Sequence, residues 1–410
     1  MNGYALLILG ALVFQHALSL WADLLNLRSL RTELPEELRD VYDPARYARS
    51  QRYARERTRF GLWEEGAGLA LLLGFWFAGG FAALDRGLSG LALGPVATGL
   101  LFLGALALGK GLFDLPFRWV STFALEERYG FNRTAPRTFW ADLGKGLLLA
   151  AGLGGPLLAA VLWLFERAGD SAWLWCWGVT ALFTLVVQFV APTWILPLFN
   201  RFTPLPEGGL RRALLRYAER VGFPLQGLFT IDGSRRSTRA NAFFTGFGKR
   251  KRVALFDTLI ARHPTDELVA IVAHEVGHYQ RGHILQGMLL AILQAGAVFF
   301  LMSVFLGQQG LYDAFFVERR SVHAGLVFFS LLYAPLDLAL SFFRQALARR
   351  NELEADAFAS ETTGAPELLV AALKRLSAEN LANLTPHPLT VKLHHSHPPL
   401  AERIRALRGG

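Results

Sequence analysis

Five consecutive residues, His274-Glu275-Val276-Gly277-His278, have the side chains and the spacing of a hydrolytic metal site. Two histidines four residues apart on a helix project from the same face, one turn apart. Both imidazoles can therefore bind one Zn²⁺, and Glu275 can accept a proton from a water on that metal. On the order of 0.01 accidental matches are expected in a chain of this composition. A pair of surface histidines on an amphipathic helix is the alternative.

The composition indicates that this motif belongs to a membrane protein. Of the 410 residues, 52% are hydrophobic and only 18% are charged, and the mean hydropathy is +0.31. Soluble domains carry about 25% charged residues. Long apolar stretches predict seven transmembrane helices, at residues 2–24, 62–84, 94–113, 140–164, 173–198, 284–306 and 322–343. No Lys or Arg precedes the first stretch, so it is interpreted as a retained helix rather than a cleavable signal peptide.

The distribution of arginines predicts how these helices are oriented. Arginines cluster between spans one and two and between spans three and four, whereas the loops near Arg86, Arg167 and Arg319 carry little positive charge. Because positive loops stay in the cytoplasm, we expect the N-terminus outside and residues 200–282 and 344–410 inside. The net charge of +9 then favours anionic lipid headgroups. No basic-aromatic motif indicates nucleic-acid binding, so the lipid bilayer is the expected partner of this charge.

The third metal ligand is expected beyond span seven. Catalytic zinc usually has three protein ligands and one open position, and two spans after His278 return the chain to the same side. The charged and apolar residues at 349–358 predict a helix that continues out of span seven. Glu352 and Asp356 share one face of it, so Glu352 can bind zinc while Asp356 holds a ligand histidine. An ordinary charged helix face is the alternative, and Glu354 points elsewhere.

Two further segments are open to more than one interpretation. His283 follows His278 by five residues and should face away from the ligand stripe, so a structural or interfacial role is predicted. Upstream, residues 242–245 and 253–256 read as short strands around a Gly/Lys/Arg turn, which is typical of a hairpin. Metallopeptidases commonly bind an extended substrate at a sheet edge. The hairpin is therefore either a substrate-binding edge or a small structural element.

Several motifs in order resemble those of the type I CAAX prenyl protease family, which are integral membrane zinc metallopeptidases of the gluzincin type. The resemblance covers most of the chain. It rests on residues 126–133 (EERYGFNR), 197–205 (PLFNRFTPL), 241–244 (NAFF), 255–259 (LFDTL), 274–278 (HEVGH), 352–358 (ELEADAF) and 395–404 (HSHPPLAERI). The family implies seven helices that enclose a large intramembrane chamber, capped by the zinc domain.

The resemblance also implies roles for individual residues. It implies that His274, His278 and Glu352 bind zinc and that Glu275 activates the water. It matches Asn241, Ala242 and Phe243 to the strand that binds the substrate backbone. It makes His397 a candidate for stabilising the tetrahedral intermediate and Arg403 a candidate active-site partner for the substrate. Without the resemblance, the histidines His394, His395 and His397 would be either a metal-binding cluster or a solvated tail.

These observations predict a mainly α, polytopic membrane protein with a small cytoplasmic α+β zinc metallopeptidase domain. We expect transmembrane helices one to five within residues 1–199 and a zinc-protease segment at 200–283. Transmembrane helices six and seven should occupy residues 284–343, and a cytoplasmic segment with the third ligand should occupy 344–410. The oligomeric state is left open by the sequence.

The predicted activity is hydrolysis of peptide bonds with one Zn²⁺ per chain. The expected partners are peptide or protein substrates that are prenylated or embedded in the membrane. The Arg-, Ala-, Leu- and Gly-rich composition and compact loops indicate a bacterial inner-membrane protein. Most bacteria lack the prenylated substrates, so a quality-control protease of broad specificity is one alternative. A channel or transporter with a structural zinc site is the other, although such sites are usually rich in cysteine and this chain has one.

Overall fold

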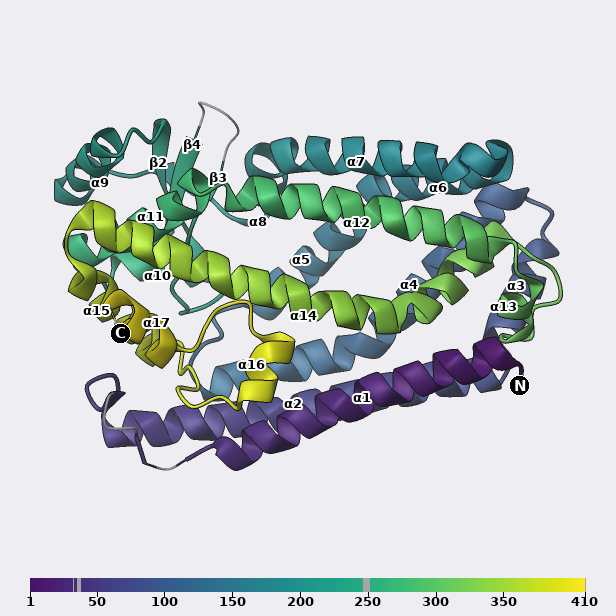
Figure 1. The fold of residues 1–410 in the computed structure, drawn as a ribbon, viewed down its shortest axis with the longest axis horizontal. Helices are drawn as coiled ribbons and strands as arrows, with labels where there is room; N and C mark the ends of the chain where they lie inside the picture. Colours follow the sequence, from purple (N-terminus) through teal and green to yellow (C-terminus); the bar gives the residue numbers. More distant parts are fainter. Residues whose placement is uncertain (32, 35–37, 246–250, 410) are drawn as a thin grey trace.

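Long helices run side by side along the molecule in the computed structural model, and a small sheet lies at one end (Figure 1). The structure describes residues 1–31, 33–34, 38–245 and 251–409, and it is 77% helical. Six helical segments in the described chain are long and apolar enough to cross a membrane, and a bent pair of helices makes a seventh. The six are built from α1 (Gly3–Ser29), α4 (Pro95–Val120), α5 (Pro136–Leu149), α6 (Gly155–Arg167), α7 (Ala172–Val190), α8 (Leu196–Phe199), α12 (His283–Leu306) and α14 (Val322–Thr363). The expectation of a seven-helix membrane protein is confirmed when the bent pair is taken as one span.

The second predicted span is not the continuous helix that its hydropathy suggests. It consists of α2 (Pro44–Phe77) and α3 (Gly80–Ser89), which meet at an angle of 59°. Gly79 between them has a φ of 73°, the left-handed conformation that ends helices and that glycine adopts without strain. Gly80 lies so close to Phe75 that a Cβ would come within 2.5 Å of its ring. The prediction missed the break because apolar composition alone does not reveal backbone direction.

Short turns of π-helix interrupt three of the membrane segments. They occupy Ser121–Glu126, Ala150–Gly154 and Ala191–Ile195, and each continues into or out of a regular helix without a break in the chain direction. Such turns insert one extra residue into a helix and change which face the following side chains occupy.

The sheet lies at the end of the molecule where the expected metal motif is found. Its order is β1-β2-β4-β3, with β2 and β4 parallel and the outer pairs antiparallel. The strands are β1 (Phe202–Pro204), β2 (Leu225–Ile231), β3 (Ala242–Thr245) and β4 (Lys251–Phe256). The pairing of β3 with β4 confirms the predicted hairpin, whose turn at 246–250 lies outside the described residues. β3 is an edge strand of this sheet.

Shorter helices surround the sheet and close the opposite end. Toward the sheet end are α9 (Gly209–Arg220), α10 (Asp257–Ile260), α11 (Thr265–Gln280), α15 (Pro366–Glu379) and α17 (Leu400–Leu407), and at the far end is α13 (Gln309–Asp313). α16 (Pro388–His394) lies away from the sheet and packs against α1 and α14. The 42 residues of α14 span about 63 Å at 1.5 Å per residue, about twice the hydrocarbon thickness of a bilayer. One half of α14 therefore crosses the membrane and the other half enters the sheet end, as the sequence predicted for the helix beyond span seven.

Two separate hydrophobic cores hold the ends of the long helices. One surrounds α11 and includes Leu255, Val276 and Ala359. The other joins α1, α3, α13 and the start of α14, with Trp76, Phe315 and Phe328 at its centre. In the most apolar stretch of each of the six spanning segments, 0 to 17% of the residues are buried. Most side chains of these stretches are therefore available to contact lipid.

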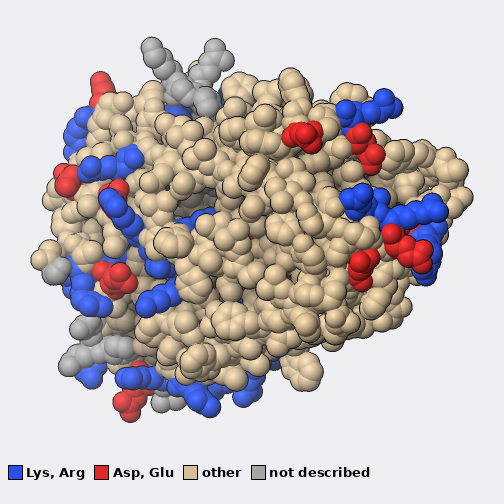
Figure 2. Space-filling model, turned by 45° about the vertical axis from the view of Figure 1, so that its right-hand side comes forward, with Lys and Arg blue, Asp and Glu red and all other residues tan. Residues whose placement is uncertain are grey.

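The surface is divided in the way that a membrane protein requires. Figure 2 shows charged side chains gathered toward the two ends of the visible face, with a broad and largely uncharged band between them. Large apolar side chains are exposed on the spanning helices, among them Phe14, Leu182 and Phe189. Burying such a band in lipid removes its apolar surface from water, which stabilises the protein in a bilayer.

Candidate metal centre

Helix α11 presents two imidazoles on one face, as the motif predicts. Its first turn carries Asp266 and Glu267, which suit the positive end of the helix dipole. The Nε2 atoms of His274 and His278 lie 3.2 Å apart. Their ring centroids are 4.8 Å apart and the rings are nearly perpendicular. Two ring nitrogens so close together point at a common position beside the helix.

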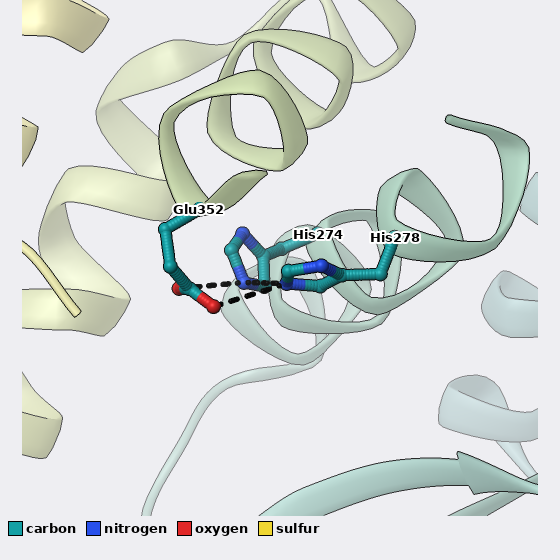
Figure 3. Close-up of side chains that lie close together, drawn as sticks. All are labelled: His274, His278 and Glu352. Carbon is teal, nitrogen blue, oxygen red and sulfur yellow. Dashed lines mark hydrogen bonds and ion pairs between the residues drawn. The ribbon is translucent and has the colours of Figure 1, made fainter. Parts of the chain in front are cut away.

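Glu352 on α14 approaches the same position from the opposite side (Figure 3). Its Oε1 lies 3.2 Å from Nε2 of His278, and its Oε2 lies 3.4 Å from Nε2 of His274. One ligand atom from each of the three residues can be chosen so that all lie within 4.8 Å of one another. Two imidazole nitrogens and one carboxylate oxygen are a donor set that suits catalytic zinc, which leaves a fourth position open. The residues present therefore fit a metal ion.

Asp356 and Arg403 support His274 from the side away from Glu352. Nδ1 of His274 lies 2.8 Å from Oδ1 of Asp356. Arg403 on α17 donates two hydrogen bonds to that carboxylate, at 2.7 and 2.6 Å. The structure therefore places Asp356 beside His274, on the opposite side of the ring from Glu352. Arg403 is predicted to contact substrate, and the structure pairs its guanidinium with Asp356 while it also lines the cavity beside His397.

The electrostatics of the site favour positive charge. Burial alone would lower the pKa of His274, but the neighbouring Asp356 and Glu352 carboxylates raise its pKa to about 9. Without a metal, a proton is therefore held where a cation would sit. Burial raises the pKa of the Glu275 carboxyl above its usual range, although the histidines around it act in the opposite direction. A carboxylate whose pKa is shifted toward neutrality is better matched to accept and return a proton.

His397 reaches the site from the loop between α16 and α17. Its Nδ1 lies 2.8 Å from Oε2 of Glu352, and 64% of its side chain is exposed. A cavity of about 560 Å³ opens beside it, lined also by Arg403, Arg57 and Arg239. The structure thus brings His397 to the three candidate ligands, whereas His394 lines a different cavity with Gln15 and Leu338. Proximity in space separates these histidines where their sequence pattern does not.

His283 does not face away from the ligand histidines as its spacing suggests. Nδ1 of His283 lies 3.0 Å from Nδ1 of His278. The spacing argument assumed one continuous helix, but α11 ends at Gln280 and α12 begins at His283. Gly282 between them has a φ of 73°, which redirects the chain. The glycine is the feature of the sequence that could have indicated this turn.

β3 contacts α11, and one of its edges pairs with no strand in the described part of the chain. The backbone N–H of Phe256 donates to the carbonyl of Asn241 at 3.1 Å, so alternate residues of β3 point their N–H and C=O groups toward β4. Those of Ala242 and Phe244 point to the open edge, and Asn241 Oδ1 accepts from the Ala242 N–H at 2.9 Å. The side chain of Phe243 lies outside the described residues. An extended peptide could pair with this edge.

Comparison with known proteins identifies the family. A family model described as "Peptidase family M48" matches residues 204–410, and one described as "CAAX prenyl protease N-terminal, five membrane helices" matches residues 23–201. The chain belongs to peptidase family M48. This M48 peptidase is 35% identical to CAAX prenyl protease 1 of Saccharomyces cerevisiae, over 92% of this chain and 88% of that protein. It is 31% identical to the human CAAX prenyl protease 1 homolog, over 98% of this chain and 95% of that protein.

A solved structure shares the whole architecture. The crystal structure of S. mikatae Ste24p superimposes with a TM-score of 0.95 at 32% identity, covering 99% of each chain. Together with the family models, this likeness confirms the resemblance drawn from the motifs. The protein is a multi-pass membrane metallopeptidase that acts on peptide substrates. A channel or transporter with a structural metal site is not favoured.

Proposed function

We propose that this M48 peptidase is a zinc endopeptidase that cleaves prenylated peptides at the membrane. One observation carries the proposal: two imidazole nitrogens and a carboxylate from helices far apart in the sequence converge beside the partly buried Glu275. Zinc is the metal that this donor set suits best, with one ion per chain. The names of the similar proteins support a CAAX-type substrate.

The chain's own residues have separate tasks in the proposed reaction. His274, His278 and Glu352 hold the metal, which when bound supplies Lewis acidity that activates water and polarises the scissile carbonyl. Glu275 accepts the proton of the attacking water and returns it to the leaving amine. His397 donates a hydrogen bond to the developing oxyanion, an effect of about 3 kcal/mol for one well-placed donor.

Two further groups of residues position these side chains and the substrate. The Asp356 carboxylate lies 2.8 Å from Nδ1 of His274 and orients its ring, and Arg403 holds Asp356. The edge of β3, at Asn241, Ala242 and Phe243, binds the extended substrate backbone, which places a peptide bond near the metal without reading much sequence.

The proposed orientation places the active site in the cytoplasm. The positive loops lie on the side of the sheet, which puts residues 200–283 and 344–410 inside and the N-terminus outside. Transmembrane helices then occupy residues 1–199 and 284–343. The composition supports a location in a bacterial inner membrane.

The decisive experiment uses the full-length protein in detergent and one peptide made with and without a farnesyl group. The metal is removed with a chelator and restored with one equivalent of Zn²⁺, and Glu275→Gln serves as the matched inactive variant. Cleavage of only the farnesylated peptide, dependent on zinc and absent in the variant, supports the proposal. Equal cleavage of both peptides would replace prenyl specificity with a broad quality-control role. Equal turnover by the chelated protein would refute the metal mechanism.

A further inference from the structure

The two candidate ligand histidines have different supporting partners. Nδ1 of His274 faces the Asp356 carboxylate, which is paired with Arg403. Nδ1 of His278 lies 3.0 Å from Nδ1 of His283, and no carboxylate among the described residues pairs with it. The second partner is another imidazole in place of an acid, and the function proposed above gives it no role.

The contact between His278 and His283 continues to the surface of the protein. Nε2 of His283 lies 3.2 Å from Oε2 of Glu354, and Arg350 donates to the other oxygen of Glu354 at 2.8 Å. The side chain of His283 is 7% exposed, that of Glu354 is 37% exposed and that of Arg350 is 76% exposed. A single line of polar contacts therefore runs from the metal position to the solvent.

If His278 binds a metal, the donor and the acceptor of each hydrogen bond in this line are fixed. Nε2 of His278 is the atom that faces Glu352, so it is the atom that binds the metal. A neutral imidazole has one N–H and one acceptor nitrogen, so Nδ1 of His278 then carries the hydrogen and donates it to Nδ1 of His283. Having accepted at Nδ1, His283 carries its own hydrogen on Nε2 and donates it to the Glu354 carboxylate. The line admits no other pairing of donors and acceptors while His278 binds a metal.

We propose that His283 is a positioning residue for the zinc site, which fixes the tautomer and the ring orientation of His278, and that Glu354 in turn orients His283. The proposal rests on the proposed zinc-peptidase function. His283 is not a fourth ligand, because its ring lies across the His278 ring from the position that Glu352 and His274 share. Gly282 is what makes the contact: its left-handed conformation turns the chain so that the first residue of α12 meets α11.

Loss of the contact between His278 and His283 should weaken zinc binding, and not only the rate of peptide cleavage. The N–H of a half-buried His278 would lose its acceptor, and the ring would be free to rotate or to adopt the other tautomer. Partners that hold a ligand histidine in this way typically contribute 10- to 100-fold to metal affinity. The expected change is therefore visible in the zinc dissociation constant, whether or not a substrate is known.

Two polar substitutions of similar size separate the two hydrogen bonds of His283. In His283→Asn, the amide oxygen takes the place of Nδ1 and can still accept from His278. In His283→Gln, the amide lies one carbon further out, where it can meet Glu354 but leaves no acceptor at the Nδ1 position. The zinc dissociation constant of each purified full-length protein is measured by competition with a chelator. The melting temperature of each zinc-free protein reports on folding.

The proposal expects His283→Asn to bind zinc with close to native affinity and His283→Gln to bind about 10- to 100-fold more weakly, with similar melting temperatures. Equal affinities in the two variants, whether native or weakened, would overturn it, because the acceptor at Nδ1 would then not matter. A native protein that binds no zinc would instead overturn the proposed function. The two failures are distinguished by the unsubstituted protein alone.

Discussion

Gly277 lies directly against the backbone of Ala355. A Cβ at Gly277 would come within 3.0 Å of the Ala355 carbonyl oxygen and 3.1 Å of its Cα. Helices α11 and α14 can therefore approach closely at the point where one carries His278 and the other Glu352. The glycine inside the histidine motif thus determines the distance between ligands from two different helices. If the backbones of α11 and α14 were further apart, the Glu352 side chain could not reach the two histidines.

Gly277→Ala should lower zinc affinity by about tenfold, because overpacking at a helix contact costs about 1–3 kcal/mol and would separate Glu352 from the histidines. Gly287→Ala on α12 is the matched control, since its Cβ would meet nothing within 4 Å. Chelator competition measures both variants. Native affinity in Gly277→Ala would show that the close approach does not control the ligand geometry.

Glu275→Gln should keep one zinc per chain and lose about 10²- to 10⁴-fold in kcat, the usual contribution of a general base. The amide has the same size but cannot accept the proton. Metal analysis and peptide cleavage are measured on the same sample. The control is Glu207→Gln, an exposed acid 77% accessible to solvent before α9. Substantial turnover by Glu275→Gln would remove Glu275 from the mechanism.

Glu352→Gln and Glu354→Gln form a matched pair on one helix. Glu352 faces both ligand histidines, whereas Glu354 faces His283 and Arg350. We expect the first variant to lose most of its zinc. We expect the second to retain one zinc per chain, because the amide oxygen in Glu354→Gln can still accept a hydrogen bond from Nε2 of His283. Metal analysis after dialysis measures both. A fully loaded Glu352→Gln protein would point to another acid, such as Asp356, as the third ligand.

Arg403→Leu should destabilise the protein by about 3–5 kcal/mol, because it leaves the buried Asp356 carboxylate without its partner. The Asp356 side chain is only 2% exposed. Arg408→Leu is the control, since Arg408 makes a similar two-bond pair with Glu367 at the surface, where solvent screens the charges and such pairs contribute little to stability. The melting temperatures of the two variants should differ clearly. Similar melting temperatures would mean that the buried Asp356 carboxylate does not need Arg403 for the protein to stay folded.

Much of the site could be predicted from local spacing. The periodicity of a helix places His274 and His278 on one face whatever surrounds them, and the same argument applies to Glu352 and Asp356 on α14. Hydropathy located the membrane segments because a bilayer requires long apolar helices. The hairpin at β3 and β4 followed from short apolar strands around a turn. These features depend on residues close together in the chain, so the sequence alone determined them.

Only the tertiary structure decided the contacts that depend on backbone direction and on packing between distant segments. Gly79 and Gly282 each turn the chain through a left-handed residue, which broke the second span and brought His283 against His278. Arg403 pairs with Asp356 because α17 packs against α14, 47 residues earlier in the chain. A single residue with a positive φ changes the direction of the chain that follows it. The sequence shows where the glycines are but not their φ angles, so these contacts could be identified only in the tertiary structure.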